Sequence, residues 1–216
     1  MQKLILLFIF TIYFIIPYLT LAQQGTWKYY TRDELKGMVA DMTQDKYGNY
    51  WFAINADYGT GKGIVSLLDT CQCWHYLYDS PECDTTMSFM KQIVVDLENN
   101  KWFVGREEKN SLLEYVVKYD DSTFTYYNPS GNEDESIIHS LGIDGEGHIW
   151  AGSIANWAYW FDGVEWHPFF VPGTLIYDPV HVFAADKKGK LYIGNENGIS
   201  TLDGWIWGGL CNKIEF

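Results

Sequence analysis

The chain has 216 residues, of which 47% are hydrophobic, 20% charged and 18% aromatic, and its formal net charge is −13. This apolar content is enough for a packed core and excludes a chain that is disordered throughout. The negative charge repels phosphate backbones, so we expect no nucleic-acid partner. The 16 Tyr, 12 Phe, 10 Trp and 20 Gly favour many short strands joined by tight turns.

The first 22 residues differ from the rest of the chain. Lys3 precedes an apolar run over residues 4–16, and Thr20 and Ala22 place small residues where a signal peptidase reads. The pattern predicts a signal peptide over residues 1–22 and a mature chain of residues 23–216 that is periplasmic or secreted. The alternative is an uncleaved anchor, because the apolar run approaches the length that spans a bilayer. After cleavage we expect no membrane contact.

A short motif then recurs four times, as Asp, Gly or Asn three residues later, and an aromatic residue three further on. Its copies are Asp45, Gly48 and Trp51; Asp96, Asn99 and Trp102; Asp144, Gly147 and Trp150; and Asp186, Gly189 and Tyr192. Successive copies are separated by about 40 to 50 residues, the length of one four-stranded propeller blade. We therefore expect a repeat protein whose units stack on one another.

The residues around each motif copy predict the same local structure. Apolar residues stand six and three positions before each Asp: Val39 and Met42, Met90 and Ile93, Ile138 and Leu141, and Val180 and Phe183. They predict a buried strand. The carboxylate accepts hydrogen bonds from backbone N–H groups in the following turn, and Gly or Asn there tolerates positive φ. We interpret the Asp and aromatic columns as structural, in preference to calcium ligands, acids or a sugar platform.

The pattern resembles the two-component regulator propeller repeat, whose core reads Asp-x-x-Gly-x-x-Trp-x-Gly-Thr. The resemblance covers about residues 27 to 207 and is best in the third and fourth copies, where Gly152 and Gly194 occupy the second Gly position. The first two copies depart from it with Ala53 and Val104. The resemblance implies a periplasmic or extracellular propeller, of the kind that forms sensor input domains or stands alone as a secreted module.

The fold that we predict is all-β: a β-propeller with four blades of four antiparallel strands. The repeats span approximately residues 27–74, 75–126, 127–168 and 169–210. An outer strand over Trp27–Tyr30 has no blade before it, and Trp207 competes with it for the same place in a closed ring. The alternative is therefore an incomplete propeller, truncated from a larger one or completed by a partner or a second copy.

One further column is polar and predicts a ligand site. Five residues before each Asp stand Ala40, Lys91, His139 and His181, at the start of the innermost strand and near the mouth of a central channel. The same end should receive the residues that follow each second strand, namely Asn55, Arg106, Ser153 and Asn195. Trp157, in the loop of the third copy, is suited to stack on a ligand.

Export makes disulfides available to the cysteines. Cys71, Cys73 and Cys83 are the candidates, and spacing does not choose between Cys71–Cys83 and Cys73–Cys83. A thiolate metal site is the alternative, but a fourth ligand of suitable spacing is missing. We predict no metal and no cofactor.

No catalytic motif is recognisable in the sequence. The function that we predict is non-catalytic recognition of a small ligand or a protein outside the cytoplasm, similar to the sensor input domains of two-component regulators. The first alternative is a propeller-fold lyase or hydrolase that uses His139, His181 and Arg106 at the channel mouth. The second is a structural or assembly protein of the cell envelope.

Overall fold

The computed structural model describes residues 27–55, 64–68, 73–77, 87–107, 114–131, 137–154, 157–171 and 179–203. The chain divides into two compact units, residues 1–31 and 32–216. In the first unit, the described residues 27–31 form no strand, and the side chains of Trp27 and Tyr29 are 99% and 85% exposed. The outer strand that we predicted over Trp27–Tyr30 is wrong, because these residues join no sheet ladder in the described part of the chain.

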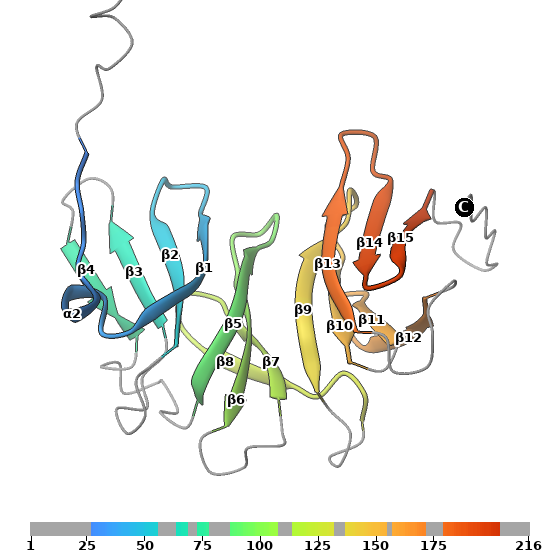
Figure 1. Cartoon of the computed structure of the whole chain (residues 1–216), viewed down its shortest axis with the longest axis horizontal. Helices are drawn as coiled ribbons and strands as arrows, with labels where there is room; N and C mark the ends of the chain where they lie inside the picture. The colour runs from blue at the N-terminus through green and yellow to red at the C-terminus, as the bar shows by residue number, and fades with distance from the viewer. Residues whose placement is uncertain are drawn as a thin grey trace, which may run out of the picture. The chain divides into compact units, whose positions relative to one another are not determined.

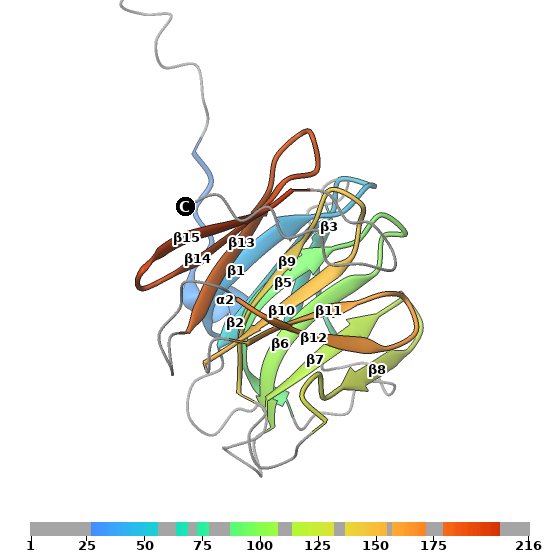
Figure 2. The ribbon, with the colours of Figure 1, turned by 90° about the vertical axis from the view of Figure 1, so that its right-hand side faces the viewer.

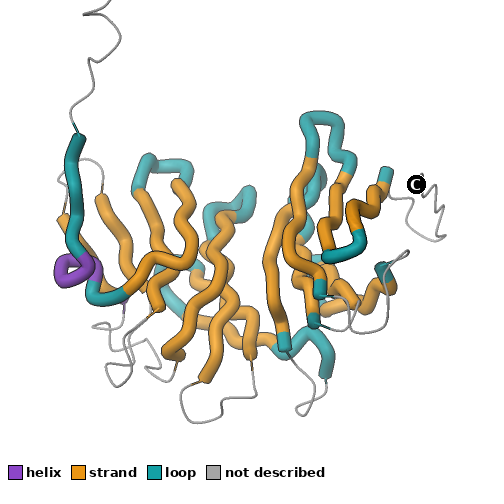
Figure 3. The backbone as a smooth tube through the Cα atoms, in the orientation of Figure 1, coloured by secondary structure: helices purple, strands orange, loops and turns teal. Residues whose placement is uncertain are grey.

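The second unit is built from strands, with one short helix among its described residues (Figure 3). The elements are α2 (Arg32–Leu35), β1 (Met38–Gln44), β2 (Tyr50–Asn55), β3 (Ile64–Leu68), β4 (Cys73–Tyr76), β5 (Met87–Val95), β6 (Lys101–Glu107), β7 (Glu114–Tyr119), β8 (Phe124–Tyr127), β9 (Ile138–Ile143), β10 (Ile149–Ser153), β11 (Trp157–Phe161), β12 (Trp166–Phe170), β13 (Val180–Ala185), β14 (Leu191–Asn195) and β15 (Gly198–Leu202). No described helix is long and apolar enough to cross a membrane.

The strands follow one another as antiparallel hairpins in four successive groups, which run in chain order across Figure 1. We name them repeat 1 (β1–β4), repeat 2 (β5–β8), repeat 3 (β9–β12) and repeat 4 (β13–β15). Repeats 1 and 2 belong to one eight-stranded sheet, because Asn55 in β2 pairs with Phe89 in β5. Repeats 3 and 4 form separate sheets of four and three strands. The prediction of an all-β fold is confirmed, and the outer strand predicted near Trp207 lies outside the described residues.

The repeated Asp turn joins the first two strands of every repeat. In each copy the N–H of the third residue after the Asp donates to the Asp carbonyl, at 3.0 to 3.2 Å. That third residue has a positive φ of 86° at Gly48, 76° at Asn99, 93° at Gly147 and 88° at Gly189. Only Gly and, at some cost, Asn adopt this conformation readily. The motif thus specifies its turn from its own residues.

The apolar core lies between consecutive repeats. The first cluster joins Trp51 and Ala53 of repeat 1 to Met90 and Ile93 of repeat 2. The second and third clusters repeat this pattern between repeats 2 and 3 and between repeats 3 and 4. The side view in Figure 2 shows the first strands β1, β5, β9 and β13 running in similar directions. Consecutive repeats therefore bury their facing sides against each other, as expected for a stacked repeat.

Polar side chains link the first strands of neighbouring repeats. The N–H of Ile93 donates to Oδ2 of Asp41 at 3.1 Å. In the next junction the N–H of Leu141 donates to Oε1 of Gln92, and in the third the hydroxyl of Ser140 donates to the carbonyl of Val180. Asp41, Gln92 and Ser140 occupy the same motif position, four residues before the Asp. These bonds fix the register of one repeat on the next.

Candidate functional site

The carboxylates of the motif Asp residues accept hydrogen bonds from their own turns. Oδ2 of Asp45 accepts the indole N–H of Trp51 at 3.0 Å, and the same contact occurs at 2.8 Å for Asp96 and Trp102 and at 3.0 Å for Asp144 and Trp150. The other oxygen accepts backbone N–H groups of the turn. In repeats 1 to 3 the carboxylate therefore connects the turn to the aromatic side chain that packs on the next repeat, and the sequence pattern did not reveal this bond.

The surroundings of Asp45 favour its ionised form. Burial by itself raises the pKa of this carboxyl, but hydrogen bonds from Trp51, Asn49 and the turn backbone outweigh burial and hold the pKa below its usual value of 3.8. A carboxylate that is buried and fully hydrogen-bonded is a structural group, and it has little capacity left for a ligand.

The predicted mouth residues Lys91 and Arg106 lie together around an acid that sequence reasoning missed. Nζ of Lys91 lies 2.7 Å from both carboxylate oxygens of Glu114, and Nε of Arg106 lies 3.9 Å from Oε1. Glu114 is only 4% exposed, and it pairs with Arg106 across the β6–β7 ladder. The sequence feature that could have identified Glu114 is an acidic residue at the start of an apolar strand, opposite an arginine on the neighbouring strand.

The two predicted histidines also meet. The rings of His139 and His181 contact edge to face with their centroids 5.1 Å apart. Burial, followed by the positive charges of Lys91 and His181, lowers the pKa of His139 below 6.5. Nε2 of His181 lies 3.8 Å from a carboxylate oxygen of Glu196. Lys91, His139 and His181 thus form one polar cluster that extends over repeats 2, 3 and 4.

The remaining predicted residues of this end have other local surroundings. Ser153 is 6% exposed at a bulge of the β9–β10 ladder. Oδ1 of Asn195 accepts the N–H of Asn197 at 2.9 Å and closes the turn before β15. Oδ1 of Asn55 is buried and has no hydrogen-bond donor within the described residues. Trp157 lies on the wall of a pocket beside β11 and β12.

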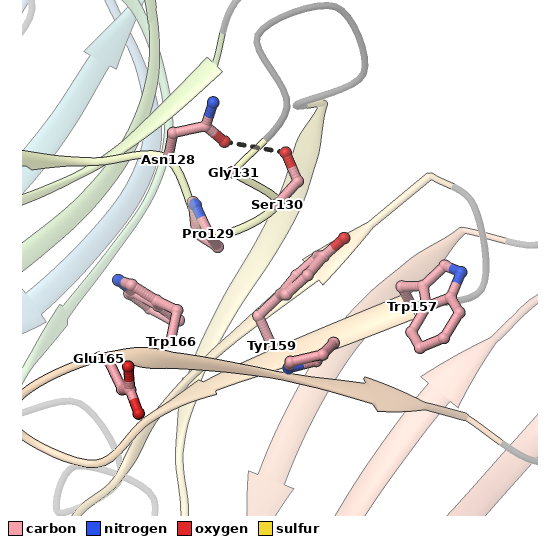
Figure 4. A pocket seen from close by; sticks show the side chains of 9 residues that line it. Asn128, Pro129, Ser130, Gly131, Trp157, Tyr159, Glu165 and Trp166 are labelled. Carbon is pink, nitrogen blue, oxygen red and sulfur yellow. Dashed lines mark hydrogen bonds between the residues drawn. The ribbon is translucent and has the colours of Figure 1, made fainter.

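A pocket of about 570 Å³ lies between β11, β12 and the turn that follows β8. Figure 4 shows aromatic side chains along its walls, from Trp157 and Tyr159 of β11 and from Trp166 of β12. The opposite wall is the turn over residues 128–131, in which the hydroxyl of Ser130 donates to Oδ1 of Asn128 at 2.9 Å (Figure 4). We call this feature the aromatic pocket.

Two of the side chains that line the aromatic pocket are exposed to solvent. Trp157 is 40% exposed, and its ring makes a T-shaped contact with the ring of Phe170, with the two centroids 5.6 Å apart. Glu165 is exposed at the start of β12. Of the predicted site residues, only Trp157 belongs to this pocket. The other lining residues come from the β11–β12 hairpin and from the turn over residues 128–131.

Asp162, Glu165 and His167 place one ligand atom each within 4.8 Å of one another. The contacts of Asp162 explain this arrangement without an ion. Its Oδ1 accepts the N–H groups of Val164 and Glu165, and its Oδ2 lies 2.8 Å from Nε2 of His167. The backbone N–H of Glu165, followed by His167, lowers the pKa of Asp162 to about 2. The group is the cap of the Asp162–Gly163 turn.

The predicted disulfides remain predictions. Cys73 is exposed at the start of β4, while Cys71 and Cys83 lie outside the described residues.

Solved structures share this fold at low sequence identity. Virginiamycin B lyase from Staphylococcus aureus has a TM-score of 0.58 at 13% identity, over 81% of this chain and 55% of the lyase. The extracellular domain assigned to a hybrid two-component system of B. thetaiotaomicron gives 0.58 at 13% identity, over 84% of this chain and 22% of that one. PorZ, a surface component of the type-IX secretion system of Porphyromonas gingivalis, gives 0.56 at 16% identity, over 76% and 25%.

No protein-family model matches the sequence, and no curated protein matches it. The chain spans about half the length of the lyase and about a quarter of the other two proteins. At these identities the likeness establishes a fold, and that fold is all-β and propeller-like. The neighbours include an enzyme and proteins of other kinds, so the function has to be argued from the site.

Proposed function

We propose that this chain is an exported, non-catalytic recognition module, built as an open, propeller-like stack of repeats 1 to 4, whose aromatic pocket binds a neutral sugar. Export is supported by the signal-peptide pattern of residues 1–22 and by the extracellular and surface locations stated for two neighbours. We infer the class of ligand from the aromatic pocket itself.

The chemistry of the aromatic pocket suits a sugar ring. A sugar presents an apolar face of C–H groups and a belt of hydroxyl groups. Trp157 and Tyr159 supply aromatic surface for the C–H face, and the carboxylate of Glu165 accepts hydrogen bonds from hydroxyls. The volume of about 570 Å³ lies within the usual range of small-ligand sites. The net charge of −13 opposes anionic sugars, so the ligand is neutral.

The polar cluster supports a non-catalytic role. Lys91 is paired with Glu114, and His139 is half-buried beside two groups that disfavour its protonation. A general acid or base needs a pKa near the working pH and reach to a substrate. These side chains instead connect neighbouring repeats, because Nζ of Lys91 in repeat 2 also donates to the carbonyl of Ile138 in repeat 3 at 3.3 Å.

The test is binding of neutral oligosaccharides, first on an array and then by calorimetry. We expect Trp157→Ala to weaken binding at least about tenfold, because it removes the exposed stacking surface. The control is Tyr47→Ala: Tyr47 is 68% exposed on the turn of repeat 1 and does not line the pocket. It should bind like the parent protein.

Two results would overturn the proposal. The first is absence of binding to every neutral oligosaccharide at millimolar concentration, or equal binding by the parent and Trp157→Ala. The second is cleavage of a bound oligosaccharide that is lost in His181→Ala with folding intact. That outcome would establish the lyase or hydrolase alternative.

A further inference from the structure

The three junctions between repeats are made in the same way. In repeats 2, 3 and 4, the residues six and three positions before the motif Asp pack on the preceding repeat. In the first junction Met90 and Ile93 are both 2% exposed and lie against Trp51 and Ala53. In the second, Ile138 and Leu141, 0% and 3% exposed, lie in one cluster with Trp102. One face of every repeat is therefore complementary to the opposite face of its neighbour.

The first repeat carries one half of such a junction with its apolar side chains exposed. Val39 and Met42 occupy the positions of Ile138 and Leu141, yet they are 37% and 54% exposed. Met38 beside them is 58% exposed. The N–H of Met42 donates to Oδ1 of Asp41, its own neighbour, where the equivalent N–H groups of repeats 2 and 3 donate to the preceding repeat. We call Met38, Val39 and Met42 the leading face.

The fourth repeat carries the other half. Tyr192, the motif aromatic, is 36% exposed, while its counterparts Trp51, Trp102 and Trp150 are at most 6% exposed. Val182 and Ile199 on the neighbouring strands are 50% and 69% exposed. Val182 also stands at the position where the other repeats carry a polar linking side chain. We call Val182, Tyr192 and Ile199 the trailing face.

We propose that the leading face of one copy of this chain docks on the trailing face of a second copy. The partner is a second copy because the two faces are the two halves of a junction that this chain already forms between its own repeats. Two such contacts between two chains close a ring with two-fold symmetry.

The net charge of the chain predicts how the association of two copies depends on salt. Each copy carries a net charge of −13, so two copies repel one another at low ionic strength. The contact between the two faces is apolar, and the trailing face lacks the linking polar side chain. Added salt therefore strengthens association, whereas a contact held by ion pairs would weaken. This inference rests on the packing of the repeats and is independent of the sugar site.

The test is the mass of the purified protein by light scattering across a dilution series at low and high salt. We expect two chains at high concentration, one chain on dilution, and a midpoint that moves to lower concentration with salt. Met42→Asp in the leading face and Ile199→Asp in the trailing face should each shift that midpoint at least about tenfold upward. Val164→Asp is the matched control, because Val164 is 85% exposed on the turn between β11 and β12.

A mixture of the two face variants distinguishes this geometry from others. Met42→Asp retains a good trailing face and Ile199→Asp a good leading face, so the mixture should recover part of the association that each variant loses alone. A single-chain mass at every concentration would overturn the proposal. So would loss of association in only one of the two variants, since this would mean that a face docks on its own copy. Circular dichroism shows whether each variant is folded.

Discussion

The motif aromatic residue lies in two different surroundings in this molecule. In repeat 2, Trp102 is 2% exposed, its indole N–H donates to Asp96 at 2.8 Å, and its ring packs on Phe161 of repeat 3 at 5.4 Å. In repeat 4, Tyr192 is 36% exposed and its hydroxyl lies 3.5 Å from Asp186. The two residues occupy the same position of the same motif.

The turns beside them are nevertheless alike. Asn99 and Gly189 both have positive φ and donate to the carbonyl of the motif Asp at 3.0 Å. The turn is therefore specified locally, whereas burial of the aromatic side chain depends on whether another repeat follows. The comparison separates the part of the motif that folds a hairpin from the part that joins repeats.

The largest effect is expected from removing the two aromatic side chains. Trp102→Ala should lower the free energy of unfolding by about 4 kcal/mol, because it leaves a cavity between two repeats and removes one of the hydrogen bonds to Asp96. Tyr192→Ala should lower the free energy of unfolding by only about 1 kcal/mol, because Tyr192 is partly exposed and packs on a single repeat. The measurement is urea unfolding in dilute protein.

Equal losses of unfolding free energy in the two variants would mean that Tyr192 is covered in solution. The same measurement at high protein concentration tests whether a second copy covers Tyr192. If the trailing face docks on a second copy, Tyr192→Ala becomes more costly there, while the cost of Trp102→Ala increases less.

The next effect concerns the second Gly of the motif. A Cβ on Gly152 would lie 2.4 Å from Oγ of Ser140 and 2.7 Å from Cβ of Val180, inside the junction of repeats 3 and 4. A Cβ on Gly194 would meet Cγ1 of the exposed Val182 at 2.7 Å, and that side chain can turn away. We expect Gly152→Ala to cost about 3 kcal/mol and Gly194→Ala less than about 1 kcal/mol. Thermal unfolding tests the order, and a larger loss for Gly194→Ala would contradict it.

The sequence could predict whatever is repeated and local. The Asp turns, the apolar residues before them and the all-β fold follow from spacing and turn chemistry, because each depends on residues a few positions apart. The Trp27–Tyr30 strand failed because an aromatic, β-favouring run does not form a strand without a neighbour to pair with. Propensity alone could not supply that neighbour.

The candidate site was less predictable, since it depends on contacts between distant residues. Lys91, His139 and His181 meet because equivalent positions of stacked repeats lie side by side, which the column predicted. Glu114 lies outside the motif and was missed. The aromatic pocket was missed, apart from Trp157, because alternating aromatics on a hairpin look the same whether they face a neighbouring repeat or a cavity.

The smallest effect concerns His139, which is half-buried, against His181, whose side chain is 40% exposed at the last repeat. Burial, Lys91 and His181 hold the pKa of His139 below 6.5 in the folded chain, so the unfolded chain binds its proton more readily. The stability that this provides is complete above about pH 6.5 and is lost as the pH falls through the folded pKa.

We expect His139→Gln to flatten the fall in unfolding free energy between about pH 7 and 5, with little change at pH 8. His181→Gln should instead raise the pKa of His139, measured by NMR titration, because it removes one positive neighbour. If the pH dependence of the unfolding free energy were unchanged in His139→Gln, the surroundings of His139 between repeats 3 and 4 would be open to water and would not lower its pKa.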